Sequence, residues 1–105
     1  MNVNEWGVEL LFSTGFDMSA FTAISMIFTK PDGTTLTVTN PGTTALIVGT
    51  ADAVTTLGTF LAHKYLQYTF QNGDVNQAGS WSVRVTYTDA TQHLISDSTT
   101  FTVGA

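Results

Sequence analysis

Two histidines are the side chains of this sequence whose ordinary pKa suits acid–base chemistry near neutral pH, and imidazole is also a common metal ligand. His93 is expected at the start of a strand, close in sequence to Asp89. No Ser lies in a nucleophile motif, and the sequence contains no phosphate-binding loop or zinc-protease motif. We therefore expect His63 and His93 to be solvated residues at strand ends, and we predict no catalytic residue.

An acidic turn over residues 74–79 is the second candidate, because its sequence Asp-Val-Asn-Gln-Ala-Gly matches the start of a calcium loop. Asp74 and Asn76 would supply oxygen ligands, and a glycine stands at the sixth position. The fifth position is Ala78 and the twelfth is Val85, where a bidentate Glu is needed. Because the spacing fails, we interpret the segment as a turn whose Asp and Asn side chains bond to backbone amides. No metal site and no cofactor are predicted.

Composition excludes several classes of function. The net charge is −5, and the basic residues Lys30, Lys64 and Arg84 lie far apart in the sequence. Nucleic acids and anionic membrane surfaces need clustered Lys and Arg, so neither is an expected partner. The lack of Cys excludes disulfides, zinc–thiolate sites and thiol nucleophiles. No basic start precedes an apolar run, and no apolar run is long enough to span a bilayer, so we expect no signal peptide and no membrane protein.

The elements that would position any site are strands. Charged residues make up only 10% of the chain, while Thr, a β-branched residue that suits both faces of a sheet, occurs 20 times. The clearest strand runs from Trp81 to Thr88, where large apolar residues alternate strictly with polar ones. The tight turn Lys30–Gly33 joins two further strands into a hairpin. We expect strands over about residues 5–13, 21–30, 34–39, 44–49, 59–70, 81–88 and 93–103.

The segment 50–58 is harder to interpret. Thr50 could cap a helical turn that carries Val54 and Leu57, with Gly58 as its left-handed stop, so we expect a loop with helical character. The alternation that follows slips by one register near residues 63–65, which favours a bulge in a long strand.

These features predict a single domain, residues 1–105, with an all-β fold: an immunoglobulin-like antiparallel β-sandwich of about seven strands and no disulfide. The apolar sides of the alternating segments predict the core. Its expected members are Trp6, Val8, Leu10, Phe12, Ile24, Met26, Phe28, Leu36, Leu66, Tyr68, Phe70, Trp81, Val83, Val85, Tyr87, Phe101 and Val103.

Six short motifs follow one another along nearly the whole chain: Ser13–Ser19, Lys30–Gly33, Tyr68–Phe70, Gly73–Val75, Ala78–Trp81 and Phe101–Val103. Their order and spacing resemble immunoglobulin-like domains of tailed-phage virions, in particular the N-terminal domain of upper baseplate proteins. In that family the domain docks a larger fibre or receptor-binding protein onto the virion. The resemblance implies a non-enzymatic structural role, and it carries over no catalytic residue because the motifs are structural.

The chain stops at Gly104-Ala105, directly after the last expected strand. We therefore expect a small accessory protein of the virion that decorates the capsid or attaches a fibre to the neck or tail. Its expected partners are other virion proteins and further copies of itself, as a homo-oligomer or in many copies. Loops and uncharged strand edges are the expected contacts. The candidate interaction residues are Phe16 in the turn 14–19, Val54 and Leu57 in segment 50–58, and Thr35, Thr37 and Thr39 on an uncharged strand.

A carbohydrate-binding module is the alternative, because aromatic residues make up 11% of the chain and stack on sugars when exposed. The alternation places both tryptophans on apolar sides, which favours the core. Phe16, Leu57 and Tyr65 lie in irregular segments and are better candidates for an exposed patch. An enzyme ranks last, because no nucleophile–base pair is visible.

Overall fold

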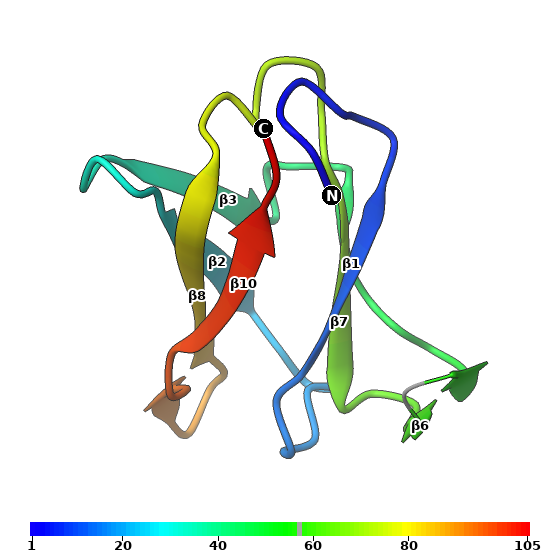
Figure 1. Ribbon diagram of the computed structural model, residues 1–105. Coiled ribbons are helices and arrows are strands. Elements are labelled where there is room, and N and C mark those ends of the chain that lie inside the picture. Colours follow the sequence, from blue (N-terminus) through cyan, green and yellow to red (C-terminus); the bar gives the residue numbers. More distant parts are fainter. Residues whose placement is uncertain (57) are drawn as a thin grey trace.

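All regular structure in the computed structural model, which describes residues 1–56 and 58–105, is β-strand (Figure 1). This confirms the all-β prediction. The described strands are β1 (Glu9–Ser13), β2 (Ala23–Thr29), β3 (Thr35–Asn40), β4 (Leu46–Val48), β5 (Ala53–Thr55), β6 (Gly58–Phe60), β7 (Tyr65–Thr69), β8 (Gly79–Thr88), β9 (His93–Ile95) and β10 (Thr99–Val103).

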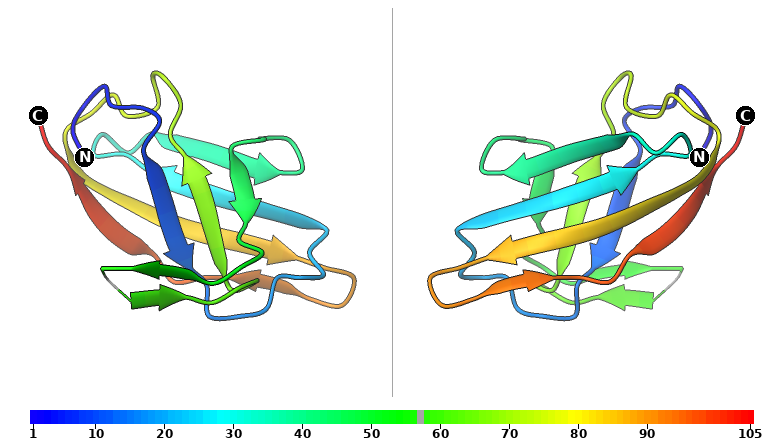
Figure 2. Two further views of the ribbon diagram at one scale, coloured as in Figure 1. Left: turned by 90° about the vertical axis from the view of Figure 1, so that its right-hand side faces the viewer. Right: turned by 90° about the vertical axis from the view of Figure 1, so that its left-hand side faces the viewer.

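Two antiparallel sheets face each other as the layers of a sandwich (Figures 1 and 2). One has the order β1-β7-β4, and the other has the order β10-β8-β2-β3 with β9 also pairing β8. Strands β5 and β6 form a separate hairpin. Strands β2 and β3 pair through the expected Lys30–Gly33 turn, in which Gly33 has a φ of 88°.

The strand order corresponds to that of an immunoglobulin domain without its first strand. Such domains place strands A, B, E and D in one sheet and C, F and G in the other, with C′ added in the variable type. In chain order, the strands of the two facing sheets give B-E-D and G-F-C-C′. The residues before β1 cross one end of the sandwich: Val3 N donates to Gly104 O at 2.9 Å, and Gly7 N donates to Phe70 O at 2.7 Å. Among the described residues no strand therefore takes the place of strand A.

The core lies between the two sheets, and most of its predicted members are buried. Its members from the central strands β2 and β8 are buried almost completely, as expected for strands with neighbours on both sides. Val8, Leu10, Leu36 and Phe101 are only half-buried. The prediction omitted five buried hydrophobic residues: Met18, Val38, Leu46, Tyr65 and Val75.

The prediction of Trp6 as a core residue is wrong, because its side chain is 62% exposed. The alternation that places it on the apolar side requires continuous extended backbone. Gly7 has a φ of 77° and Asn4 a φ of 69°, so the strand begins only at Glu9.

The segment 50–70 also differs from the prediction. The expectation of a loop with helical character over 50–58 is wrong, because β5 and β6 pair as a hairpin there. The expected long strand 59–70 is two strands, β6 and β7, separated by a turn at which His63 takes a φ of 62°. The His63 N–H donates to Gly49 O at 2.8 Å, and its C=O accepts from Met18 N at 2.7 Å. These bonds hold the left-handed residue where the register slip predicted a bulge.

Candidate docking surfaces

The two histidines lie in different parts of the fold. His93 begins β9, is exposed, and places Nδ1 2.7 Å from Thr88 Oγ1. His63 is half-buried in the turn before β7, which corrects its expected solvated position. Among the described residues, no three or more His, Asp or Glu side chains gather as a metal-binding group. The described part of the chain also contains no helix that could cross a membrane.

The acidic turn over residues 74–79 has a structural role. Asp74 accepts from a backbone amide, as predicted, but Asn76 bonds to a side chain instead. The Asp74 carboxylate accepts a hydrogen bond from Gln71 N at 2.8 Å and another from the Tyr68 hydroxyl. Burial, together with this carboxylate, raises the pKa of Tyr68 far above its ordinary value. Asn76 instead accepts from Lys30 Nζ at 2.8 Å, and Lys30 lies 5.4 Å above the Trp81 ring. The turn thus anchors the start of β8 and holds no free ligand set.

Asp89 closes the turn between β8 and β9. Its carboxylate accepts from Thr91 N at 2.8 Å, Gln92 N at 2.9 Å and the Tyr87 hydroxyl at 2.7 Å. The Thr91 N–H is the largest cause that lowers the Asp89 pKa to about 2, and the carboxylate in turn raises the pKa of Tyr87 to about 12. Both groups keep their charge state at neutral pH, which suits a structural role.

The turn 14–19 does not present an exposed aromatic. Phe16 is half-buried, packs against the core, and meets the Tyr87 ring edge-on at 5.2 Å. Its expected exposure is therefore wrong, while its role as a contact residue stays a prediction. Tyr65 is 6% exposed and donates from its hydroxyl to Ala51 O at 2.8 Å, so its assignment to an exposed patch is also wrong.

Strand β3 is an edge strand, as predicted for the threonine-rich segment. Lys30 N donates to Thr34 O at 2.8 Å, which fixes the alternation: even-numbered residues of β3 bond to β2, and odd-numbered ones point their backbone groups away. The outward groups of Thr39 both bond to Thr43: Thr39 N donates to Thr43 Oγ1 at 3.2 Å, and Thr39 O accepts from Thr43 N at 2.6 Å. Thr35 and Thr37 are both exposed. Their outward backbone groups form an uncharged stretch of the edge to which another strand can pair.

Exposed apolar side chains occur in the hairpin β5–β6, in β4 and directly after β6. Val54 is 82% exposed, Leu61 51% and Ile47 44%. The hairpin is held to the sheet by Phe60, whose ring meets Tyr65 at 5.8 Å. Leu57, the remaining candidate from this segment, lies outside the described residues.

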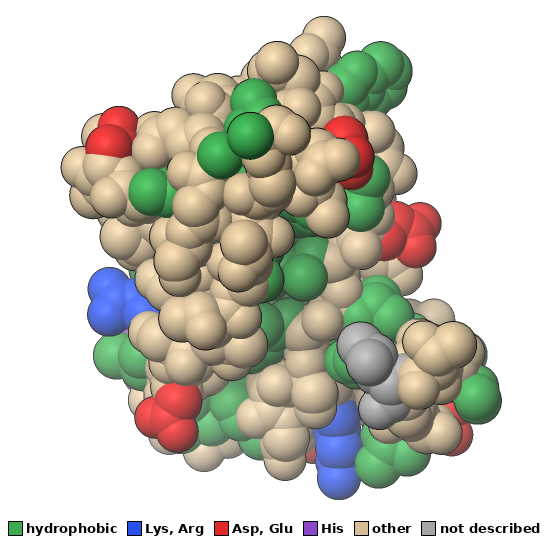
Figure 3. Space-filling view, in the orientation of Figure 1, with side chains coloured by type: hydrophobic (Ala, Val, Ile, Leu, Met, Phe, Trp, Pro, Cys, Tyr) green, Lys and Arg blue, Asp and Glu red, His purple; other side chains and the backbone are tan. Residues whose placement is uncertain are grey.

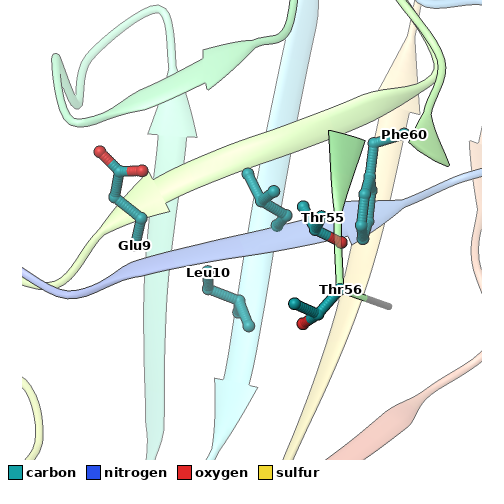
Figure 4. A pocket seen from close by; sticks show the side chains of 6 residues that line it. Glu9, Leu10, Thr55, Thr56 and Phe60 are labelled. Atoms are coloured by element: carbon teal, nitrogen blue, oxygen red, sulfur yellow. The ribbon is translucent and has the colours of Figure 1, made fainter. Parts of the chain in front are cut away.

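A pocket of about 280 Å³ opens between this hairpin and strand β1 (Figure 4). Apolar side chains dominate its wall on the β1 side, and threonines line it on the hairpin side. The lining residues are Glu9, Leu10, Leu11, Thr55, Thr56 and Phe60. The sequence contains no signal for this pocket, because the pocket depends on the hairpin β5–β6 in a segment whose pattern predicts a loop.

The sandwich is open on the side bounded by β1 and β10, which we call the open side. Both strands end their sheets, and Figure 3 shows a hollow between them with hydrophobic side chains at its floor. Leu10 and Phe101 belong to the inward-facing sets of these strands but remain half-buried.

Comparisons of this chain with family models, with curated proteins and with solved structures gave no match.

Proposed function

We propose that this protein is a non-catalytic docking module of a tailed-phage virion, where it decorates the capsid or attaches a fibre to the neck or tail. The order of its sequence motifs supports the virion role through their resemblance to upper baseplate proteins. The observation that carries the docking role is a set of strands that pair on one side only among the described residues: β3 and β10, which carry no charged residue, and β1, whose one charged residue is Glu9. Such edges bind other proteins by strand addition or by packing.

In this role the protein is present in virions in several copies, and it contacts capsid, neck, tail or fibre proteins or further copies of itself. A surface with few charges loses little hydration energy when it is covered, which suits such contacts. The 10% charged fraction and the exposed threonines of β3 are consistent with this role.

Mass spectrometry of purified virions from the phage that encodes the gene tests the proposal. The wild-type protein is expected in the particles, and Thr37→Lys is expected to be reduced because a charged edge resists an added strand. Thr44→Lys places the same charge on an exposed turn residue and should be retained like wild type. A gene neighbourhood without capsid, portal or tail genes, and virions that lack the wild-type protein, would contradict the virion role.

The exposed Trp6 favours carbohydrate binding as the second candidate, because indole rings stack on sugars when they are accessible. Trp81 is completely buried, so sugar-dependent quenching of tryptophan fluorescence would report on Trp6. A glycan that quenches the wild type but not Trp6→Phe would favour this function over docking. We expect no such glycan in an array.

A further inference from the structure

Among the described residues, strand β1 pairs with β7 on one side only and has no strand partner on the side toward the open side. Phe70 N donates to Val8 O at 2.9 Å, and Thr14 N donates to Lys64 O at 3.0 Å, so the even-numbered residues bond toward β7. In an antiparallel ladder the alternate residues point the other way. Glu9, Leu11 and Ser13 therefore direct their N–H and C=O groups outward, where the described sheet has no further strand.

This edge is the position that strand A occupies next to strand B in an immunoglobulin sheet. The N-terminal residues begin a different pairing at β10, where Asn2 and Gly104 form a parallel bridge, and then cross the end of the sandwich. They leave the length of β1 uncovered and its inward Leu10 half-buried. An added strand would complete both the backbone pairing and the burial.

The pocket lies where such a strand would place a side chain. Leu11 is on the outer face of β1, opposite Gln67, and lines the pocket together with Thr56 and Phe60. A residue paired with Leu11 would point to the same face, because paired residues share a face of the sheet. At about 280 Å³ the pocket accepts a medium-sized apolar side chain. Backbone pairing would then supply affinity, and the pocket would supply selectivity.

Charge identifies the kind of strand that fits. Glu9 is the only charged residue of β1, β5, β6 and β10 in the described bounds of these strands. Each copy carries a net charge of −5, and the described edge strands β1, β3, β4 and β10 contain no Lys or Arg. A second copy would therefore add repulsion and bring no cation to Glu9.

We infer that the open edge of β1 accepts an extended segment of another protein, with an apolar residue opposite Leu11 and a Lys or Arg opposite Glu9. The inference rests on the proposed docking function and names its binding mode. The added segment takes the place of strand A, fills the pocket, and pairs its cation with the carboxylate at the start of β1.

A short synthetic peptide tests this binding mode on the isotope-labelled protein by NMR. In the peptide, Thr alternates with apolar residues, and a Val and a Lys stand two positions apart to face Leu11 and Glu9. Titration should shift the resonances of β1 and of the hairpin β5–β6 and should slow amide exchange at Leu11. The same peptide with N-methyl groups on the amides that face β1 should not bind, since strand pairing needs those donors.

Two variants of the protein make the test specific. Glu9→Lys should weaken binding of the Lys peptide about threefold, as for an exposed ion pair, and a peptide with Glu in place of Lys should recover the loss. Leu11→Pro removes an N–H that the described ladder does not use, so it should abolish binding while the fold survives. Thr37→Pro makes the matched change on the β3 edge and should bind the peptide like wild type.

Absence of peptide-induced shifts at β1, or equal binding by Leu11→Pro, would overturn the inference. A concentration-dependent dimer in sedimentation that Leu11→Pro dissociates would replace the foreign segment with a second copy, and would also overturn it. Failure here is distinct from failure of the proposed function. Strand addition is wrong if the peptide fails while the protein is found in virions, and the virion role is wrong if the peptide binds while virions lack the protein.

Discussion

The centre of the five-stranded sheet and the edge strand β1 both carry inward-facing apolar residues, but they bury them to different extents. Strands β2 and β8 pair on both sides, and the inward residues Met26, Phe28 and Val85 are 0% exposed. Strand β1 pairs on one side among the described residues, and its inward Leu10 stays half-buried beside a pocket. Burial is therefore most complete where a strand pairs on both sides, while the edge strand β1 keeps an inward apolar side chain partly accessible.

The two tryptophans give the largest contrast. Trp81→Ala should reduce the free energy of unfolding by about 3–5 kcal/mol, because it removes a completely buried ring from β8 and its hydrogen bond to Gln77 O. Trp6→Ala should change it by less than about 0.5 kcal/mol. Chemical denaturation of both variants measures the difference, and similar losses would contradict the placement of Trp6 outside the core.

Gly49 probes how tightly the three-stranded sheet is packed. A Cβ at this position would overlap the ring of Tyr65. Gly49→Ala should therefore cost about 1–3 kcal/mol in denaturant unfolding, as overpacking does. Thr50→Ala, at the exposed neighbouring residue, is the matched control and should be nearly neutral. A neutral Gly49→Ala would show that Tyr65 can move away and that this sheet is loosely packed.

Acid should weaken the five-stranded sheet through Asp89. Its pKa falls from 3.8 to about 2 on folding, so its contribution to stability is complete above about pH 4 and is lost as the pH falls to about 2. Asp89→Asn should be less stable than wild type at neutral pH and lose less stability over that window. Thermal unfolding at several pH values measures this, with Asp97→Asn as the control. Parallel pH curves for wild type and Asp89→Asn would contradict the assignment.

Thr37→Lys should have the smallest effect on stability, within about 0.5 kcal/mol, because the side chain is exposed on an edge strand. Its reduced presence in virions would then reflect lost contacts rather than lost fold. Matching unfolding curves for Thr37→Lys and Thr44→Lys are the required control. If Thr37→Lys is destabilised, its reduced presence in virions would reflect loss of the fold, which would contradict a direct role of the β3 edge in the contact.

The sequence predicts the parts of the fold that repeat with a strict period. The alternation from Trp81 to Thr88 predicts β8, and the Lys30–Gly33 turn predicts the pairing of β2 with β3. The edge position of β3 is also predicted, from its lack of charge. In these segments local preference and burial agree, so a single sequence is sufficient.

The remaining features depend on backbone conformations and distant contacts that no local pattern encodes. Trp6 keeps the apolar period, yet positive φ values at Asn4 and Gly7 place it outside the core. Phe16 lies in a turn but is half-buried against Tyr87. The pocket needs the hairpin β5–β6 folded beside β1, a contact between segments that are each unremarkable in sequence.

Amide hydrogen exchange along β1 tests the open edge most directly. We expect exchange rates to alternate along the strand. Leu10 and Phe12 should exchange slowly because their backbone groups bond to β7, while Glu9, Leu11 and Ser13 should exchange much faster because their backbone groups face the open side. Uniformly slow exchange across Glu9–Ser13 in the isolated protein would show that the edge is already covered, and would contradict the account.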